Sequence, residues 1–309
     1  MALNDLLPSG YIDAHHHVWA PDTRGDEIGY GWLRDIGAPK PFGDPTPIQR
    51  DYLMEEFLAE AEVAPRASVH VQTDGALPDP VAETAFVQAE ADRCDHTVRI
   101  VGLADLSAGD LAETLARHGA YNGFCGVRQI VGRLAHRPDL TFAPRDFMAE
   151  NQWREGLKRL EGDGLTFDLQ MYPEQAEQAL EALSATPALR VIIDHALCPY
   201  DQRAEGYELW NKAVGMLAAR PNTWIKLSGW GMYDSGWDRF GVEAIQPYVD
   251  DIMLSFGADR VMWGSNYPVE KLAKRYQACI EEIAGGILSE QHDAVFLLSA
   301  ATAYGVKLT

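Results

Sequence analysis

The sequence predicts a single-domain α/β protein, a (β/α)8 TIM barrel in which eight parallel strands alternate with helices. Three observations support this fold. Eight short apolar runs alternate with helical patterns between residues 11 and 285. Most runs are rich in Val, Ile and Leu without polar alternation, as in strands buried on both faces. No linker or composition shift divides the chain, so we expect one domain over residues 1–309.

The expected elements follow in strict alternation. We expect strands at residues 11–15, 67–72, 98–105, 124–130, 165–171, 189–194, 223–229 and 260–265. We expect helices at residues 50–62, 79–93, 110–119, 151–162, 173–185, 206–219, 242–257 and 269–285. The first of these carries Leu53, Phe57 and Ala61 on one apolar stripe, as a helix that packs against a sheet does. An extra C-terminal helix at 289–305 would have Ser289 as its cap.

A long loop, residues 20–49, follows the first expected strand. It is rich in Pro and Gly, and it is much longer than an ordinary strand-to-helix connection. We therefore expect a flap over the mouth of the barrel. A doubly wound open sheet is the alternative fold, but such sheets more often carry a glycine-rich phosphate loop after an early strand. The sequence contains no such loop.

Composition narrows the classes of partner. The chain has 26 Lys and Arg against 46 Asp and Glu, a net charge of −20, which disfavours nucleic acid and anionic membranes. Its four cysteines form no CxxC pair, the first ten residues do not resemble a signal peptide, and no apolar run reaches the roughly 18 residues of a membrane span. We expect a cytoplasmic protein that acts on a small molecule, and we leave open whether it is a homo-oligomer.

Polar residues gather where the expected strands stop, which is where barrel enzymes place their active sites. These residues are His15, His16, His17, His70, Gln72, Arg128, Gln170, Tyr172, Asp194, His195, Lys226, Ser228, Ser265 and Asn266. Side chains alternate along a strand, so we expect His15 and His17 to point into the mouth and His16 away from it. By the same rule, we expect Asp194 to point away from the direction of His195.

The predicted histidine cluster fits a metal site. Imidazole is a good ligand for zinc and related divalent ions, and His195 would add a third ligand across the barrel from His15 and His17. The alternative is that these histidines bind substrate or pack in the core. We keep both possibilities open: one divalent ion, zinc or manganese, or a metal-independent site.

Six segments together resemble a known family. In order they are IDAHHHVW, CGVRQI, FDLQMYPEQ, VIIDHALCP, WIKLSGW and RVMWGSNYPVEKL. Their order and spacing are similar to those of the amidohydrolase-2 type barrels, and most similar to the branch with sugar-acid lactonases and 2-pyrone-4,6-dicarboxylate lactonase. The resemblance covers about residues 11–305. It implies a hydrolase of the amidohydrolase superfamily.

One position departs from the family pattern. The family ends its eighth strand with a motif like GSDWP, whose aspartate is the expected base or a metal ligand, whereas this chain reads GSNYP, with Asn266 there. An asparagine amide cannot take up a proton at working pH. Three outcomes remain: His195 acts as the base, a metal held by His15, His17 and His195 activates the water, or no base is needed. His195 and Asn266 are therefore the candidate catalytic residues.

Arg128 is the main candidate for binding the substrate. Its planar guanidinium fits a carboxylate, and the resemblance implies a substrate-binding arginine in the GVR segment. The alternative is an ion pair with a carboxylate of the barrel. Lys226 either contacts substrate or pairs with Asp105 or Asp168. The remaining substrate-binding candidates, which would orient the ring, are His70, Gln72 and Tyr172.

The leading hypothesis is a hydrolase that opens a lactone, or a similar cyclic ester, of a small carboxylated or polyhydroxylated acid. Water would be activated at the barrel mouth by histidines, with or without one divalent metal. A binuclear site is not expected, because the fourth strand offers no bridging lysine or glutamate. Two alternatives stay open: a zinc-dependent non-oxidative decarboxylase of an aromatic or unsaturated acid, and a catalytically impaired barrel that only binds a metabolite.

Overall fold

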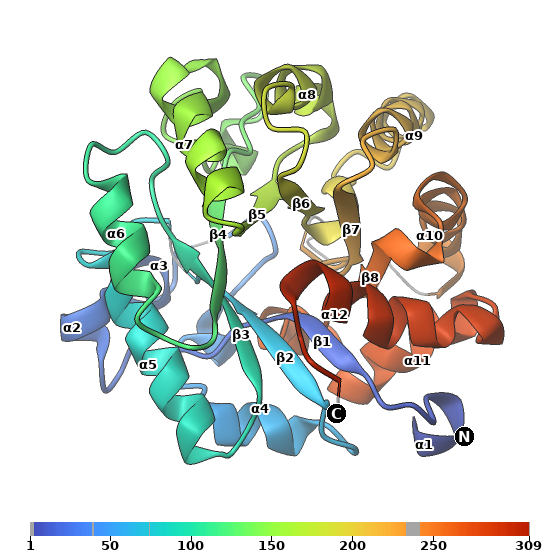
Figure 1. The fold of residues 1–309 in the computed structure, drawn as a ribbon. Helices are drawn as coiled ribbons and strands as arrows, with labels where there is room; N and C mark the ends of the chain where they lie inside the picture. The colour runs from blue at the N-terminus through green and yellow to red at the C-terminus, as the bar shows by residue number, and fades with distance from the viewer. Residues whose placement is uncertain (1–2, 39, 74, 233–241, 309) are drawn as a thin grey trace.

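The computed structural model describes residues 3–38, 40–73, 75–232 and 242–308. Eight parallel strands form one sheet in chain order, from β1 to β8 (Figure 1). This confirms the predicted (β/α)8 barrel, and each predicted strand is present. The strands are β1 Ile12–His16, β2 Ala67–Val71, β3 Val98–Leu103, β4 Phe124–Ile130, β5 Thr166–Gln170, β6 Arg190–Ile193, β7 Thr223–Leu227 and β8 Val261–Trp263.

The two ends of the sheet meet directly after β8. The backbone N–H of Asn266 donates to the carbonyl of His15 over 2.7 Å, and that of His17 donates to the carbonyl of Tyr267 over 2.7 Å. These bonds close the ring at its carboxyl-terminal rim. They also fix the first and last strand ends beside each other, where the expected site lies.

Eight longer helices cover the outside of the barrel (Figure 1). They are α4 Met54–Glu60, α5 Pro80–Arg93, α6 Leu111–His118, α7 Asn151–Gly162, α8 Ala176–Leu183, α9 Ala204–Ala218, α10 Val242–Phe256 and α11 Tyr276–Gly286. The helix predicted from residue 269 begins later. Residues Val269–Leu272 form a 3-10 turn that buries Val269 and Glu270, and Arg275 is extended before α11 starts. No helix among the described residues is long and apolar enough to cross a membrane.

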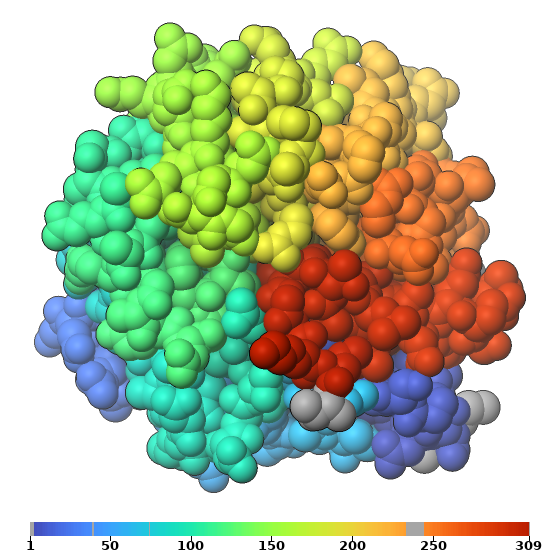
Figure 2. Space-filling view, in the orientation of Figure 1, coloured from blue at the N-terminus to red at the C-terminus, as the bar shows by residue number. Residues whose placement is uncertain are grey.

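The C-terminal segment closes the bottom of the barrel. It is not the single helix predicted from residue 289: a 3-10 turn at Ser289–Gln291 precedes a π-helical turn at Ala294–Leu298 and helix α12, Ser299–Tyr304. Ser289 begins that first turn and does not cap it, because Leu288 holds the cap position. Figures 1 and 2 show α12 and its flanking residues across the near end of the barrel.

Residues from strands and from α12 form one core inside the ring. This core joins Ile12, Val69, Met262, Ala303 and Tyr304, while a larger apolar layer lies between the strands and the outer helices. The barrel interior is therefore packed from below, and the cavity lined by the described residues lies toward the carboxyl ends of the strands.

The predicted flap lies over that end. Residues 20–49 contain two short helices, α2 Gly25–Ile28 and α3 Gly31–Arg34, and a 3-10 turn at Thr46–Ile48. Trp32, Lys40 and Phe42 of this segment line the cavity at the mouth. The indole of Trp32 packs edge-on against Trp19, with ring centroids 5.6 Å apart. This confirms the long loop after the first strand as a cover for the site.

Candidate active site

A cavity of about 660 Å³ opens at the carboxyl ends of the strands. Its floor is formed by side chains that follow or end different strands. These are His17, Arg128, Gln170, His195 and Asn266. The barrel therefore brings together residues that are up to 249 positions apart in the chain, as in the contact of His17 with Asn266.

The end of β1 keeps the predicted alternation. His15 and His17 both face the interior, with ring centroids 5.1 Å apart. His16 points outward and stacks on Phe57 of α4, with centroids 4.0 Å apart. His15 is fully buried behind His17, so only His17 is part of the described cavity lining.

The end of β6 does not keep the alternation. The strand stops at Ile193, and the four residues from His195 to Cys198 all have positive φ, between 50° and 61°. Because His195 leaves the extended conformation, its side chain turns to the same side as that of Asp194. Ligand atoms of His15, Asp194 and His195 lie within 4.8 Å of one another. The expectation that Asp194 points away from His195 was therefore wrong.

Two glycines make room for these imidazoles. Gly229 has φ +68°, and a Cβ there would lie 2.4 Å from Nδ1 of His195. A Cβ on Gly264 would lie 2.7 Å from the Cβ of His15. Both distances are shorter than any tolerable contact, so a larger residue at either position would displace a histidine of the site.

A buried charge network lies beneath the histidines. Nζ of Lys226 is 2.6 Å from Oδ2 of Asp168 and 3.0 Å from Oδ1 of Asp194. It also lies 3.1 Å from Nδ1 of His15, and the Tyr304 hydroxyl donates to Asp168 over 2.7 Å. Lys226 thus forms the ion pair with Asp168 that was one of its two predicted roles. It lies below the described cavity lining.

The pKa values of the two carboxylates are shifted in opposite directions. Burial raises the pKa of Asp168 to about 6, although the ammonium of Lys226 opposes this. Burial also acts to raise the pKa of Asp194, but the charge of Lys226 and the contact with His15 outweigh it and hold that pKa well below its usual range. Asp194 is therefore ionised near pH 7, as a carboxylate that binds a metal must be, and Asp168 is mostly ionised as well.

The histidines at the floor are neutral near pH 7. Burial lowers the pKa of His195 to about 3, and it holds the pKa values of His15 and His17 well below their usual range. Nδ1 of His17 donates to the carbonyl of Val71 over 2.7 Å, so Nε2 carries the lone pair. A neutral imidazole with a free lone pair can bind a metal or accept a proton.

That lone pair of His17 faces Asn266. Nε2 lies 3.3 Å from the assigned Oδ1 of the amide, and two acceptors at this distance repel each other. A hydrogen donor or cation that touches both atoms removes the repulsion, as does rotation of the amide by 180°. The pair is therefore suited to hold a third group, such as water.

The group of His15, Asp194 and His195 fits one divalent ion. Nε2 of His15 is buried and has no hydrogen-bond partner among the described residues. Two neutral imidazoles and one ionised carboxylate form a donor set typical of zinc. This group shares His15 and His195 with the predicted set, whereas His17 faces Asn266 and lies outside it. An ion here would share Asp194 with Lys226.

Arg128 combines both of its predicted environments. It lines the cavity, and its Nη1 donates to Oε1 of Gln170 over 3.2 Å. Nη2 donates to the backbone carbonyl of Gln72, and Oδ2 of Asp194 lies 3.6 Å from Nη1. Nε is buried without a hydrogen-bond partner in the described part of the chain.

Three other predicted residues lie outside the described cavity lining. The Gln72 side chain is buried, and its amide atoms find no partner among the residues described. Nδ1 of His70 accepts from the backbone N–H of Val18 over 3.2 Å. The Tyr172 hydroxyl donates to the carbonyl of Leu140 over 2.6 Å. Direct contact of these three with substrate stays a prediction.

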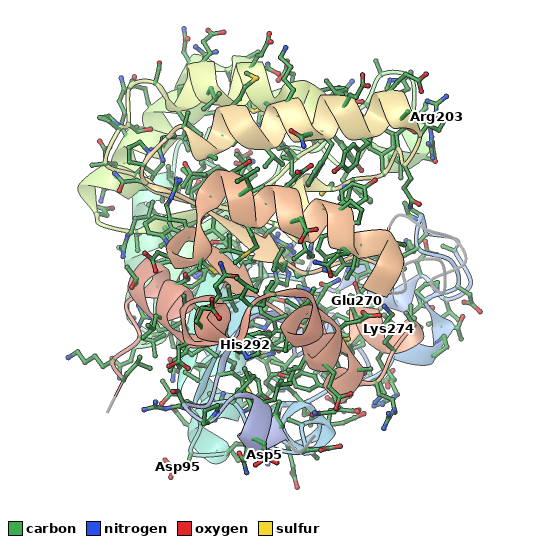
Figure 3. All side chains as sticks on the ribbon, turned by 90° about the vertical axis from the view of Figure 1, so that its right-hand side faces the viewer. Asp5, Asp95, Arg203, Glu270, Lys274 and His292 are labelled. Atoms are coloured by element: carbon green, nitrogen blue, oxygen red, sulfur yellow. The ribbon has the colours of Figure 1, made fainter. Side chains whose placement is uncertain are left out.

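Two residues of the site region were not foreseen. Tyr304 reaches Asp168 from the opposite end of the chain, a contact that no local pattern indicates. Glu270 is buried one turn after Asn266, accepts from the backbone N–H of Gly231 over 3.2 Å, and has its pKa raised to about 7 by burial. Figure 3 shows Glu270 close to Lys274. The sequence signal that could have identified Glu270 is its position shortly after the GSNYP segment.

The family model for amidohydrolases matches residues 12–306. An uncharacterized protein of Sinorhizobium fredii, y4mH, is 35% identical over 96% of this chain and 98% of its own length. An L-fucono-1,5-lactonase of Burkholderia ambifaria is 28% identical over 86% of this chain and 82% of its own.

Solved structures also match this chain over nearly its whole length. An amidohydrolase of Burkholderia multivorans, crystallised with bound zinc, superposes with a TM-score of 0.78 at 25% identity, over 96% of this chain and 99% of its own. A protein of Pseudomonas putida described as a putative 2-pyrone-4,6-dicarboxylic acid hydrolase superposes with a TM-score of 0.72, over 97% of this chain and 99% of its own. At 19% identity this match supports the fold alone.

Proposed function

Because the chain belongs to the amidohydrolase family and is a hydrolase, we propose that it opens a lactone, or a similar cyclic ester, of a small carboxylated or polyhydroxylated acid. At the family level, the lactonase relatives support lactone hydrolysis. One observation carries the finer proposal. Neutral His17 and His195 face the same cavity floor as Asn266 and the cationic Arg128.

The attacking water sits between His17 and Asn266. A water that donates one hydrogen to Nε2 of His17 and one to Oδ1 of Asn266 satisfies both acceptors and directs its oxygen lone pairs into the cavity. The proton lost during attack goes to an imidazole, because the amide of Asn266 is not basic. A positioned base of this kind contributes roughly 10²–10⁴ in rate.

Two histidines compete for this proton. In a site without metal, a water that donates to His195 in place of Oδ1 of Asn266 passes its proton to His195, which is one of the outcomes expected from the departure at Asn266. If His15, Asp194 and His195 hold an ion, His195 is occupied and His17 becomes the base. An ion there would act as a Lewis acid on the carbonyl oxygen of the lactone. The zinc-bound relative supports this second arrangement.

Arg128 orients the substrate in either case. Its guanidinium forms part of the floor and presents its positive charge to a carboxylate or another polar ring substituent. In this proposal the other predicted residues do not touch the substrate and instead hold neighbouring side chains or backbone in position. Gln72 holds Arg128 through its carbonyl, Lys226 holds Asp194, and His70 and Tyr172 support the neighbouring backbone.

The test is a panel of lactones and small cyclic esters, assayed with the purified full chain by proton release. The protein is assayed as isolated, after chelation, and after zinc or manganese is restored, with metal content measured at each stage. We expect ring opening of at least one lactone. Release of carbon dioxide from unsaturated acids, without opening of any lactone, would instead favour a decarboxylase.

The variant Asn266→Asp distinguishes an enzyme from a barrel that only binds. If the parent is active and the variant is weaker, the amide takes part in the mechanism. If the parent is inactive and the variant gains hydrolysis, the parent is a binding protein and the proposal is wrong. Asp139→Asn is the control, because Asp139 is exposed, pairs with Arg137 and is not among the described residues that line the cavity.

A further inference from the structure

Within the proposed lactonase function, on which this step rests, we infer that the substrate carries a bulky apolar substituent on its ring. An aryl or branched alkyl group matches the apolar walls of the cavity better than a polyhydroxylated sugar ring does. The inference comes from a difference between the floor of the cavity and its walls.

The walls are predominantly apolar. Thirteen of the 24 described lining residues are apolar, and five of these are aromatic. Trp32 and Phe42 come from the flap, and Phe142 and Phe147 come from the connection between β4 and α7. Two segments far apart in sequence thus present aromatic rings to one space, which suits a flat or branched apolar group.

Three polar residues of the walls, Asp105, Gln129 and Arg145, are already bonded within the protein. Arg145 donates to Glu150 over 2.6 Å and to Asp105 over 3.1 Å. Oε1 of Gln129 accepts from the indole of Trp153 over 2.7 Å, and the Gln129 amide donates to Asp105 over 3.2 Å. Ring hydroxyls of a sugar lactone would have to break these bonds to be recognised, and a buried polar group left unpaired is costly.

The polar atoms without a hydrogen-bond partner among the described lining residues lie mostly at the floor. They include Nε of Arg128 and Nδ2 of Asn266, next to the lone pair on His17. In the wall, the hydroxyl of Thr73 is the one further such atom. The lactone carbonyl and any carboxylate therefore belong at the floor, and the rest of the substrate faces apolar side chains.

The volume of the cavity and the exposure of Phe142 also support an apolar substituent on the substrate. A volume of about 660 Å³ falls in the range of roughly 300–1,000 Å³ that holds drug-sized ligands. A bare lactone ring would leave water against the aromatic walls. Phe142 is 39% exposed, and it is the aromatic residue among the exposed large hydrophobic side chains of the described chain. A substituent that covers this ring removes apolar surface from water on both partners.

The experiment compares γ-phenyl-γ-butyrolactone, γ-methyl-γ-butyrolactone and L-fucono-1,5-lactone under identical conditions. Burial of about 100 Å² of additional apolar surface predicts kcat/KM roughly 30- to 100-fold higher for the phenyl than for the methyl compound. We expect Phe142→Ala to reduce this ratio about tenfold and to leave the methyl compound unaffected. Leu209→Ala is the matched control, because Leu209 is also 39% exposed but lies outside this cavity.

Binding measurements with compounds that cannot be hydrolysed test this inference separately from the proposed function. The dissociation constants of 2-phenyl- and 2-methyltetrahydrofuran-2-carboxylate, which cannot be hydrolysed, are measured by calorimetry. Tighter binding of the phenyl compound without any lactonase activity would remove the proposed function and keep the apolar specificity. Equal binding of both compounds, or faster hydrolysis of the sugar lactone, would overturn the inference while lactone hydrolysis could still stand.

Discussion

The ends of β1 and β6 both supply histidines to the site, but they do so by different geometry. At β1 the alternation of an extended strand places His15 and His17 inside and His16 outside. At β6 the chain leaves the strand, and a run of positive φ brings Asp194 and His195 to the same side. Alternation thus predicts side-chain direction only as far as the backbone stays extended.

The largest expected effect is a difference in kcat/KM between variants of two histidines, His195 after β6 and His16 at the end of β1. We expect His195→Ala to lower kcat/KM by roughly 10²–10⁴, the range for loss of a base or of a ligand that assists it. His16→Phe, which preserves the stack on Phe57 and removes buried imidazole nitrogens without partners in the described chain, should stay within about threefold of the parent. Steady-state kinetics on the best lactone of the panel measure both. Similar losses in the two variants would contradict the geometric distinction.

The second effect is a loss of stability on changing Asp194, the carboxylate that the chain turns inward after β6. We expect Asp194→Asn to lower the free energy of unfolding by about 3–5 kcal/mol, because the buried charges of Lys226 and Arg128 lose a counter-ion. Urea unfolding at pH 8 measures this change. Asp139→Asn is the control, since Asp139 pairs with Arg137 at the surface. A stability equal to that of the parent would mean that the network is not charged as described.

Acid sensitivity gives a smaller, signed effect. The pKa of His195 is lowered to about 3 in the folded state, whereas the unfolded chain takes up the proton near 6.5. The folded protein therefore loses stability as pH falls below about 6.5, by about 2 kcal/mol at pH 5 from this residue.

We expect His195→Asn to remove that part of the pH dependence. Between pH 8 and pH 5, the free energy of unfolding of the variant should fall by about 2 kcal/mol less than that of the parent. Urea titrations in chelator at both pH values measure the difference. His136→Asn, at an exposed position, should follow the parent. Parallel curves for parent and His195→Asn would contradict the lowered pKa.

The smallest effect tests the backbone itself. Ala196 has φ 50°, where an L-residue is strained by about 1–2 kcal/mol, while buried Ala67 pairs with Ile12 of β1 in regular strand geometry. Each Ala→Gly change removes one buried methyl group, but only Ala196→Gly relieves strain. We expect it to cost about 1 kcal/mol less than Ala67→Gly in urea unfolding. An equal or larger cost would show that the turn after β6 is not strained.

The sequence predicted the barrel well because buried parallel strands have a strong local signature. All eight apolar runs became strands, and the fold then placed His195 beside His15, with ring centroids 4.5 Å apart. The Lys226–Asp168 ion pair was also among the predicted alternatives. These successes need only strand positions and closure of the ring.

The sequence-based predictions failed where backbone dihedral angles or contacts between distant segments determine the structure. The positive φ of His195 depends on Gly229, which leaves space for the imidazole, and no pattern within VIIDHALCP indicates it. The start of α11 was placed too early because the segment after Asn266 is helical in composition but buries Glu270 in a 3-10 turn. The contact of Tyr304 with Asp168 joins residues 136 positions apart.

That last contact has a consequence for how the protein matures in the cell. Lys226 is held by Asp168, and Asp168 is held in turn by a hydroxyl that enters from the bottom of the ring. The hydroxyl of Tyr304 can therefore bond to Asp168 only after the chain has been translated beyond residue 304 and that segment has left the ribosome. Until then the Lys226–Asp168 pair lacks this hydrogen bond.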